Sequence, residues 1–175
     1  MKTTDGLIFY PGGKVEAKAY APLLQDLADR GLTSVLVEMP FNLAVFGINK
    51  ADTVYAAFPE IENWFLVGHS LGGAMASSYA QKHMDKLKGL ILLGAYPLKD
   101  IELPTLALYG TFDQGTKLTK LQNVQSMEII GGNHAYFGDY GEQKGDGTAL
   151  ITREEQQNQT VDAIERFVLE TEKTK

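Results

Sequence analysis

The sequence predicts an α/β fold, a three-layer sandwich in which helices cover both faces of a sheet of about six mostly parallel strands. First, its short apolar runs lack the alternation of polar and apolar residues that marks half-exposed strands, as is typical of parallel strands covered on both sides. Second, helical patterns lie between most of these runs. The chain has 175 residues, of which 44% are hydrophobic and 22% are charged. This length and composition suit one globular domain spanning residues 1–175.

Six apolar runs are the expected strands, and a glycine or a proline closely follows each of them. The runs are Leu7 to Tyr10, Ser34 to Val37, Trp64 to Val67, Leu90 to Leu93, Thr105 to Tyr109 and Met127 to Ile130. Only nine residues, Ala95 to Leu103, separate the fourth run from the next. A parallel crossover usually takes about a dozen residues or more. We therefore expect either a helix reduced to a turn or a displaced strand boundary here, and no room for an inserted lid.

Helical patterns are expected over residues 20–30, 49–58 and 70–84, and from Thr152 towards the C-terminus. The first ends at Arg30-Gly31, a basic last turn followed by a glycine stop. The last opens with Thr152-Arg153-Glu154-Glu155, which has the spacing of a capping box. Its apolar residues Val161, Ile164 and Val168 share one helix face, which we expect to be buried.

Charge and composition exclude several classes of function. The formal net charge is −6 and no basic cluster is visible, so we expect no nucleic-acid partner. Cysteine is absent, which excludes disulfides, thiolate metal sites and a cysteine nucleophile. No run approaches the roughly 18 to 20 apolar residues of a membrane span. Met1 to Gly6 carries no signal-peptide pattern, and the early first strand is compatible with either a native or a truncated N-terminus.

The segment Gly68-His69-Ser70-Leu71-Gly72 carries the most informative motif, Gly-x-Ser-x-Gly between an apolar strand and a helix rich in small residues. At such a turn the serine hydroxyl is lifted above the carboxyl edge of the sheet, and small flanking glycines leave room for the strained backbone. The helix that follows points its N–H groups towards the place where an oxyanion would form. The alternative is a tight turn with an incidental serine.

A serine nucleophile requires a histidine base and a carboxylate that orients it. Of the three histidines, His134 follows the last apolar run, whereas His69 is expected to pack within the site wall and His83 to end a helix. Asp113 follows the fifth run and is the expected acid. The rival carboxylates are Asp100, in the short connection, and Asp139 and Asp146, downstream of the histidine.

The chain order Ser70, Asp113, His134 is that of the α/β-hydrolases, and the chain resembles a small member of that superfamily from Phe9 to the final helix. More narrowly, Pro11 to Val15 and Gly132 to Gly141 resemble a bacterial branch grouped with dienelactone-hydrolase-like proteins. True dienelactone hydrolases use a cysteine nucleophile, so their substrate is not carried over. The resemblance implies a minimal α/β-hydrolase fold without a cap domain. This chain has no membrane span of its own. The resemblance is compatible with the extracytoplasmic domain of a secreted or membrane-anchored bacterial protein, and the compartment stays open.

The oxyanion hole is expected from two backbone N–H groups, those of Leu71 and Gly13, with Lys14 close behind. A candidate pocket is formed by Lys14, Phe41, Asn42, Tyr96 and Tyr136. The segment that contains Phe41 is unusually apolar for a loop, so it either packs down or lines a binding surface. No metal site is expected.

The sequence therefore predicts a serine hydrolase that cleaves a small carboxylic ester or a related acyl compound through an acyl-enzyme, with no cofactor. Thioesterase, peptidase or acyltransferase activity on the same triad is an alternative, as is a hydrolase-like binding module that does not catalyse. Because no cap interrupts the chain, we expect an open site that suits small or exposed acyl groups. The substrate and the oligomeric state stay open.

Overall fold

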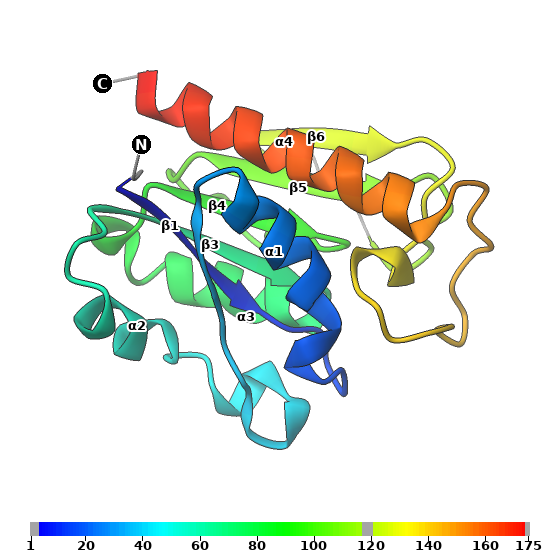
Figure 1. The fold of residues 1–175 in the computed structure, drawn as a ribbon, viewed down its shortest axis with the longest axis horizontal. Helices are drawn as coiled ribbons and strands as arrows, with labels where there is room; N and C mark the ends of the chain where they lie inside the picture. The colour runs from blue at the N-terminus through cyan, green and yellow to red at the C-terminus, as the bar shows by residue number, and fades with distance from the viewer. Residues whose placement is uncertain (1–3, 117–120, 174–175) are drawn as a thin grey trace.

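The computed structural model describes residues 4–116 and 121–173 of the chain. Within these residues there is one six-stranded sheet, parallel throughout, with the strand order β2-β1-β3-β4-β5-β6 (Figure 1). The strands are β1 Asp5–Tyr10, β2 Thr33–Leu36, β3 Asn63–His69, β4 Gly89–Leu93, β5 Thr105–Gly110 and β6 Val124–Ile129. The predicted α/β class and parallel sheet are confirmed.

Each of the six apolar runs contributes to one strand, but the last one is displaced. β6 begins three residues before the predicted start at Met127, and Ile130 lies beyond its end with 70% of its surface exposed. The early residues of β6 include the exposed Gln125 and Ser126, because this strand forms an edge of the sheet. An edge strand with solvent-facing polar residues does not read as an apolar run, so its start was missed.

Four α-helices lie among the described residues: α1 Ala21–Asp29, α2 Ala51–Ala57, α3 Leu71–Ala80 and α4 Arg153–Lys173. The predicted capping box of α4 is present. The Glu155 N–H donates to Thr152 Oγ1 at 3.1 Å, and the Thr152 N–H donates to the Glu155 carboxylate at 2.7 Å. α4 then buries Val161, Ile164 and Val168, as the spacing predicted.

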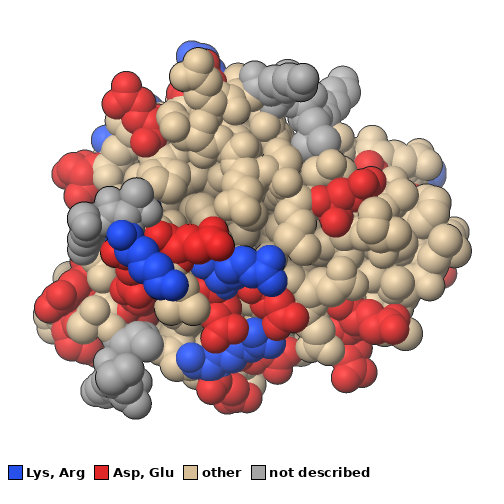
Figure 2. Space-filling model, turned by 90° about the horizontal axis from the view of Figure 1, so that it is seen from above, with Lys and Arg blue, Asp and Glu red and all other residues tan. Residues whose placement is uncertain are grey.

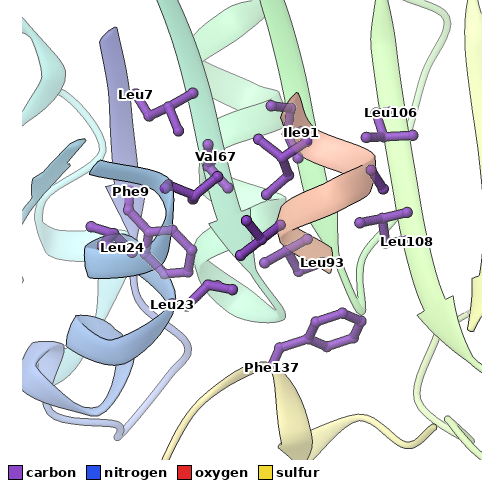
Figure 3. Packing of buried hydrophobic residues seen from close by; sticks show 14 of the residues in the cluster. Leu7, Phe9, Leu23, Leu24, Val67, Ile91, Leu93, Leu106, Leu108 and Phe137 are labelled. Carbon is purple, nitrogen blue, oxygen red and sulfur yellow. The ribbon is translucent and has the colours of Figure 1, made fainter. Parts of the chain in front are cut away.

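The helices divide the core into two layers, with α1 and α4 on one face of the sheet and α2 and α3 on the other (Figure 1). On the first face, Leu23 and Leu24 of α1 lie beside Phe9 and Val67 of the sheet (Figure 3). Phe137, from the loop that carries His134, packs into the same cluster. That contact ties a loop at the carboxyl edge of the sheet directly to the core.

The short connection between β4 and β5 contains no helix. It covers the sheet with two side chains instead, since Ile101 and Leu103 are 3% and 6% exposed and belong to the core cluster of the second face. Of the two expectations for this connection, a helix reduced to a turn or a displaced strand boundary, the structure shows the first. No cap domain is present among the described residues, as expected for a small α/β-hydrolase core.

Charged side chains on the α4 side of the molecule are mixed in sign. Figure 2 shows this side, where Lys and Arg lie among Asp and Glu rather than in one basic patch. Arg30, which follows α1, pairs with Asp162 at 2.7 Å and Glu165 at 2.6 Å on α4. In the part of the chain that the structure describes, no helix is long and apolar enough to cross a bilayer.

Candidate active site

Ser70 stands at the turn between β3, which ends at His69, and α3, which begins at Leu71. Its backbone has φ 54° and ψ −121°, a conformation that costs a non-glycine residue about 1–3 kcal/mol and persists only where its surroundings enforce it. The Ser70 N–H donates to the Leu93 carbonyl at 3.0 Å, and the Ser70 carbonyl accepts the N–H of Ala74 at 3.0 Å. Both sides of the turn are thus held by regular structure.

The flanking glycines are required by close backbone contacts. A Cβ on Gly68 would lie 2.5 Å from the Gly72 carbonyl oxygen, and a Cβ on Gly72 would lie 2.2 Å from the carbonyl oxygen of Tyr10. The first turn of α3 therefore packs directly onto the end of β1. This contact brings the serine beside the loop that follows β1.

Asp113 and His134 meet in a buried pair. His134 Nδ1 lies 3.0 Å from Asp113 Oδ2, and the two side chains are 7% and 0% exposed. Asp113 follows β5 and His134 follows β6, so the carboxyl ends of neighbouring parallel strands bring them together. Because a neutral imidazole that donates from Nδ1 has an unprotonated Nε2, His134 can take up a proton there.

The carboxylate of Asp113 also accepts hydrogen bonds from Gly115 N–H at 2.9 Å, Thr116 N–H at 3.1 Å and Thr116 Oγ1 at 2.7 Å. Burial on its own would raise the pKa of Asp113, but the hydrogen bonds from His134 and Thr116 outweigh it and hold the pKa below its usual value. Asp113 is consequently a carboxylate at neutral pH. It can stabilise a positive charge on the imidazole.

Ser70 and the buried pair are joined through Leu93 and Gly94. Leu93 accepts the Ser70 N–H, and a Cβ on the next residue, Gly94, would lie 2.7 Å from His134 Nδ1. The rings of His134 and His69, the neighbour of Ser70, have centroids 4.8 Å apart. Asp113 and His134 thus form a pair, and Ser70 lies at the same carboxyl edge of the sheet; among the described residues no hydrogen bond links the Ser70 hydroxyl to His134.

The rival carboxylates lie elsewhere. Asp146 accepts the backbone N–H groups of His134 at 3.1 Å and Ala135 at 2.8 Å, so it holds the histidine's turn rather than its ring. Asp139 accepts a hydrogen bond from Gln157 at 2.8 Å, and Asp100 is exposed. The support that Asp146 gives was not predicted, because it depends on a contact across a loop that has no motif.

The loop after β1 and the start of α3 line a cavity of about 430 Å³ that is partly open to solvent. Its walls include Gly13, Lys14, Ser70 and Leu71. The Lys14 N–H donates to the Asn42 carbonyl at 2.7 Å, so it is already engaged. Within the described residues no hydrogen bond uses the Gly13 N–H, and the first N–H groups of a helix, including that of Leu71, have no partner inside the helix.

Other predicted pocket residues lie outside this cavity. Phe41 and Asn42 are exposed on the adjoining loop, Tyr96 is half-buried after β4, and Tyr136 lines a separate cavity of about 180 Å³. The second wall of the main cavity comes from Tyr140, Glu142, Gln143 and Lys144. Glu142, Gln143 and Lys144 could not be predicted as wall residues, since a polar, glycine-rich segment gives no signal of where it folds back.

Of the remaining histidines, His69 has its predicted structural role, whereas the prediction that His83 ends a helix is wrong, because α3 already stops at Ala80. His69 is fully buried in the site wall, and His83, beyond the end of α3, stacks on Tyr79 with ring centroids 4.2 Å apart. Among the described residues, no three His, Asp or Glu side chains are grouped in a way that could hold a metal ion.

Comparison with protein families finds that the model described as alpha/beta hydrolase family matches residues 6–158. A curated relative, the proline iminopeptidase of Thermoplasma volcanium, is 32% identical over 95 residues, which are 47% of this chain and 32% of the relative. The chain thus spans about a third of the length of that curated relative.

Solved structures share the fold over nearly the whole chain. A monoacylglycerol lipase from Paleococcus ferrophilus is 15% identical with a TM-score of 0.68, covering 93% of this chain and 94% of its own. Est1E from Butyrivibrio proteoclasticus, solved with bound ferulic acid, is 14% identical with a TM-score of 0.68, covering 98% and 90%. At these identities the similarity establishes the fold alone.

Proposed function

Because the chain belongs to the alpha/beta hydrolase family, we propose that it is a serine hydrolase that cleaves a small carboxylic ester through an acyl-enzyme. One observation carries the proposal: the buried hydrogen bond between His134 and Asp113, 3.0 Å long, beside a serine held in a strained turn. In this proposal one α/β-hydrolase domain spans residues 1–175. The similarity of Pro11 to Val15 and Gly132 to Gly141 further favours the dienelactone-hydrolase-like branch, with serine as the nucleophile.

In the proposed reaction, His134 Nε2 accepts the hydroxyl proton of Ser70 while Oγ attacks the ester carbonyl. The oxyanion of the tetrahedral intermediate accepts hydrogen bonds from the N–H groups of Leu71 and Gly13. His134 then gives its proton to the departing alcohol, and the acyl-enzyme remains. Water, activated by His134, releases the acid, while Asp113 stabilises the imidazolium in both steps. This route uses no metal ion and no organic cofactor.

The shape of the site supports a small acyl substrate. The cavity beside Ser70 has a volume of about 430 Å³, is partly open to solvent and has no cap domain over it among the described residues. Ligand pockets for small molecules have volumes of about 300–1,000 Å³. Est1E, whose fold is similar, is a protein solved with a small aromatic acid. In the proposal Lys14 lines the pocket, and Phe41, Asn42, Tyr96 and Tyr136 lie around it.

The proposal is tested with a fluorophosphonate probe and with p-nitrophenyl acetate. We expect the unaltered protein to be labelled and to hydrolyse the ester, and Ser70→Ala to lose labelling and about 10³-fold or more in kcat/KM. Ser78→Ala is the matched control, since this serine is half-buried on α3 and its hydroxyl donates to the Ala74 carbonyl of the same helix at 3.1 Å. Labelling that persists in Ser70→Ala, or no labelling of the unaltered protein, contradicts a covalent serine mechanism.

Peptidase activity is the second candidate, favoured by the 95-residue match to a proline iminopeptidase. Rates on p-nitrophenyl acetate and on proline p-nitroanilide separate the two. We expect the ester to react faster, since its alcohol leaves without the strong protonation that an amine requires. Faster cleavage of the anilide would reverse the assignment.

A further inference from the structure

A buried chain of hydrogen bonds runs beneath the candidate active site. The backbone N–H of Gly12 donates to Tyr20 Oη at 3.0 Å, and Tyr20 Oη lies 2.7 Å from His69 Nδ1. On the other side of the ring, His69 Nε2 lies 2.9 Å from the backbone carbonyl oxygen of His134. The side chains of Tyr20 and His69 are both completely buried. The chain of contacts therefore lies away from solvent.

The direction of each hydrogen bond follows from the chemistry of the groups. A carbonyl oxygen only accepts, so His69 Nε2 carries the proton and donates to His134. Burial lowers the pKa of His69 to about 3, with the nearby His134 adding to the effect, so the ring is neutral and its Nδ1 is an acceptor. Tyr20 must then donate to Nδ1, while its oxygen accepts the Gly12 N–H. The Tyr20 hydroxyl and both ring nitrogens of His69 thus each have a hydrogen-bond partner.

The chain of bonds joins the three segments that the proposed mechanism needs. Gly12 precedes Gly13, the proposed oxyanion donor; His69 precedes Ser70; and the third anchor is the backbone of His134 itself. The fit is close, because a Cβ on Gly12 would lie 2.7 Å from Tyr20 Oη and 3.1 Å from His69 Nδ1. No side chain can be accommodated at that position without displacing the two rings.

Tyr20 is itself held by the core. Its ring centroid lies 4.7 Å from that of Phe9 on β1 and 5.6 Å from that of His69, and it immediately precedes α1. A hydroxyl fixed in this way can set the position of a loop, since buried donors and acceptors in a low-dielectric interior tolerate little displacement. Groups that act on a transition state must be placed within about 0.5 Å of their productive geometry.

We propose that Tyr20 and His69 are positioning residues that hold the oxyanion loop, the serine turn and the histidine turn in one arrangement. This inference rests on the proposed serine hydrolase function. It predicts that breaking the chain of bonds lowers the rate of the chemical step more than it weakens substrate binding. A merely structural role would lower stability without that selective loss.

The experiment compares Tyr20→Phe with Tyr10→Phe. Tyr10 is a matched control because its buried hydroxyl likewise accepts a backbone N–H, from Ala51 at 2.9 Å, and donates to a carbonyl, that of Ile48 at 2.7 Å, on the other face of the sheet. Both variants are expected to lose similar stability in urea. For p-nitrophenyl acetate we expect kcat to fall about 10- to 100-fold in Tyr20→Phe, with a much smaller change in KM, and to be retained in Tyr10→Phe.

A rescue variant sharpens the test. His69→Gln keeps a side-chain N–H that can reach the His134 carbonyl, whereas His69→Ala removes both links. We expect His69→Gln to retain a larger kcat than His69→Ala. Equal kcat values for Tyr20→Phe and the unaltered protein, or equal losses in Tyr20→Phe and Tyr10→Phe, would overturn the positioning role.

A measurement without substrate separates this inference from the proposed function. Nitrogen-15 NMR of the unaltered protein is expected to show His69 protonated at Nε2 and unprotonated at Nδ1 at neutral pH. Protonation at Nδ1 instead would overturn the chain of bonds even in an active enzyme. If this tautomer is found but the unaltered protein neither hydrolyses esters nor reacts with the fluorophosphonate, the proposed function fails, and the positioning role fails with it.

Discussion

Asp113 carries its negative charge in a place where burial opposes it. Its side chain is fully buried, yet four hydrogen bonds from His134, Gly115 and Thr116 favour the ionised form more strongly than burial disfavours it. The charge is therefore present before any substrate binds. A positive imidazole at His134 meets a partner that needs no rearrangement, which is how preorganised electrostatics lowers a barrier.

Replacing Asp113 with Asn tests both its role and its charge. We expect kcat for p-nitrophenyl acetate to fall about 10³- to 10⁴-fold, because an amide does not fix the imidazole tautomer or stabilise its charge. The folded-state pKa of Asp113 is below the usual 3.8, so its contribution to stability is present above pH 3.8 and is lost as the pH falls through the lower folded value. Lowering the pH below 4 is thus expected to reduce the free energy of unfolding, measured in urea, more for the unaltered protein than for Asp113→Asn.

The control is Asp100→Asn, which changes an exposed carboxylate and is expected to follow the acid profile and the kcat of the unaltered protein. An acid profile of Asp113→Asn that matches the unaltered protein would contradict the stated origin of the pKa shift.

At this scale the sequence located the residues that have a motif and missed those that have only a tertiary contact. Glycine spacing placed Ser70 at a strand-to-helix turn, and the strand ends placed Asp113 and His134 at the same edge, where the structure has them. Their catalytic roles stay predictions. Three contacts have no such motif and could not be predicted: Asp146 with the His134 N–H, Gln156 with the Asn133 N–H, and Tyr20 with His69. They join residues 12, 23 and 49 positions apart along the chain.

The loop after β2 is an element that stores backbone strain beside the cavity. Phe41 and Asn42 both have left-handed backbones, with φ of 55° and 53°, each at a cost of about 1–3 kcal/mol. The Asn42 carbonyl accepts the Lys14 N–H at 2.7 Å, so the strained loop is joined to the proposed oxyanion loop. Two exposed rings, those of Phe41 and Phe46, pack edge to face with centroids 5.9 Å apart.

An exposed aromatic pair beside a site can bind the apolar part of a substrate. In the double variant Phe41→Ala/Phe46→Ala we expect KM for p-nitrophenyl butyrate to rise about three- to tenfold, because the acyl group loses part of its apolar burial against the two rings. We expect little change in kcat. Both rings are largely exposed, at 86% and 62%, so the free energy of unfolding in urea is expected to change by less than about 0.5 kcal/mol per site.

Leu169→Ala is the control for this loop, since Leu169 is an exposed apolar residue on α4 with 49% of its surface accessible. It is expected to leave KM unchanged. A double variant with the KM of the unaltered protein would show that the aromatic pair takes no part in binding.

Among the elements, the buried strands were predicted best and the edge strand β6 was predicted worst. β1, β3 and β4 are apolar on both faces, so their runs stand out in the sequence. β6 is different, because Ser126 and Glu128 point into solvent and interrupt its apolar run. The turn at Ala95 to Leu103 stayed ambiguous for another reason: two buried side chains, Ile101 and Leu103, replace a helix there, and periodicity cannot reveal that.

Taken as a whole, the molecule covers its two faces unequally. α1 and α4 cover the first face, while within the described residues no helix follows β4 or β5 on the second face before β6. The edge strand β6 compensates for the missing helix with polar side chains. Ala107 pairs with Ser126, and Tyr109 pairs with Glu128, so the outer strand carries polar residues where a covering helix would require apolar ones. The exposed side chains of Ser126 and Glu128 thus keep this part of the second face polar.

This interpretation predicts the effect of restoring an apolar surface. In the double variant Ser126→Val/Glu128→Val we expect the apparent mass by light scattering to rise with protein concentration, since an uncovered apolar edge strand promotes association. Circular dichroism is expected to stay as in the unaltered protein. Glu60→Val, which removes a charge from an exposed turn, is the control and is expected not to associate. A double variant whose mass is independent of concentration would contradict the interpretation.

The position of β1 inside the sheet has a kinetic consequence. β1 lies between β2 and β3, and its pairing with β3 sets Asp5 opposite Asn63, 58 residues later, with a hydrogen bond of 2.9 Å between their side chains. Closing so long a loop costs chain entropy before the strand contacts compensate for it, and parallel pairing offers no shorter route. We therefore expect the meeting of distant strands to limit the folding rate of this protein, whereas helices form within about a microsecond and add little to the time required.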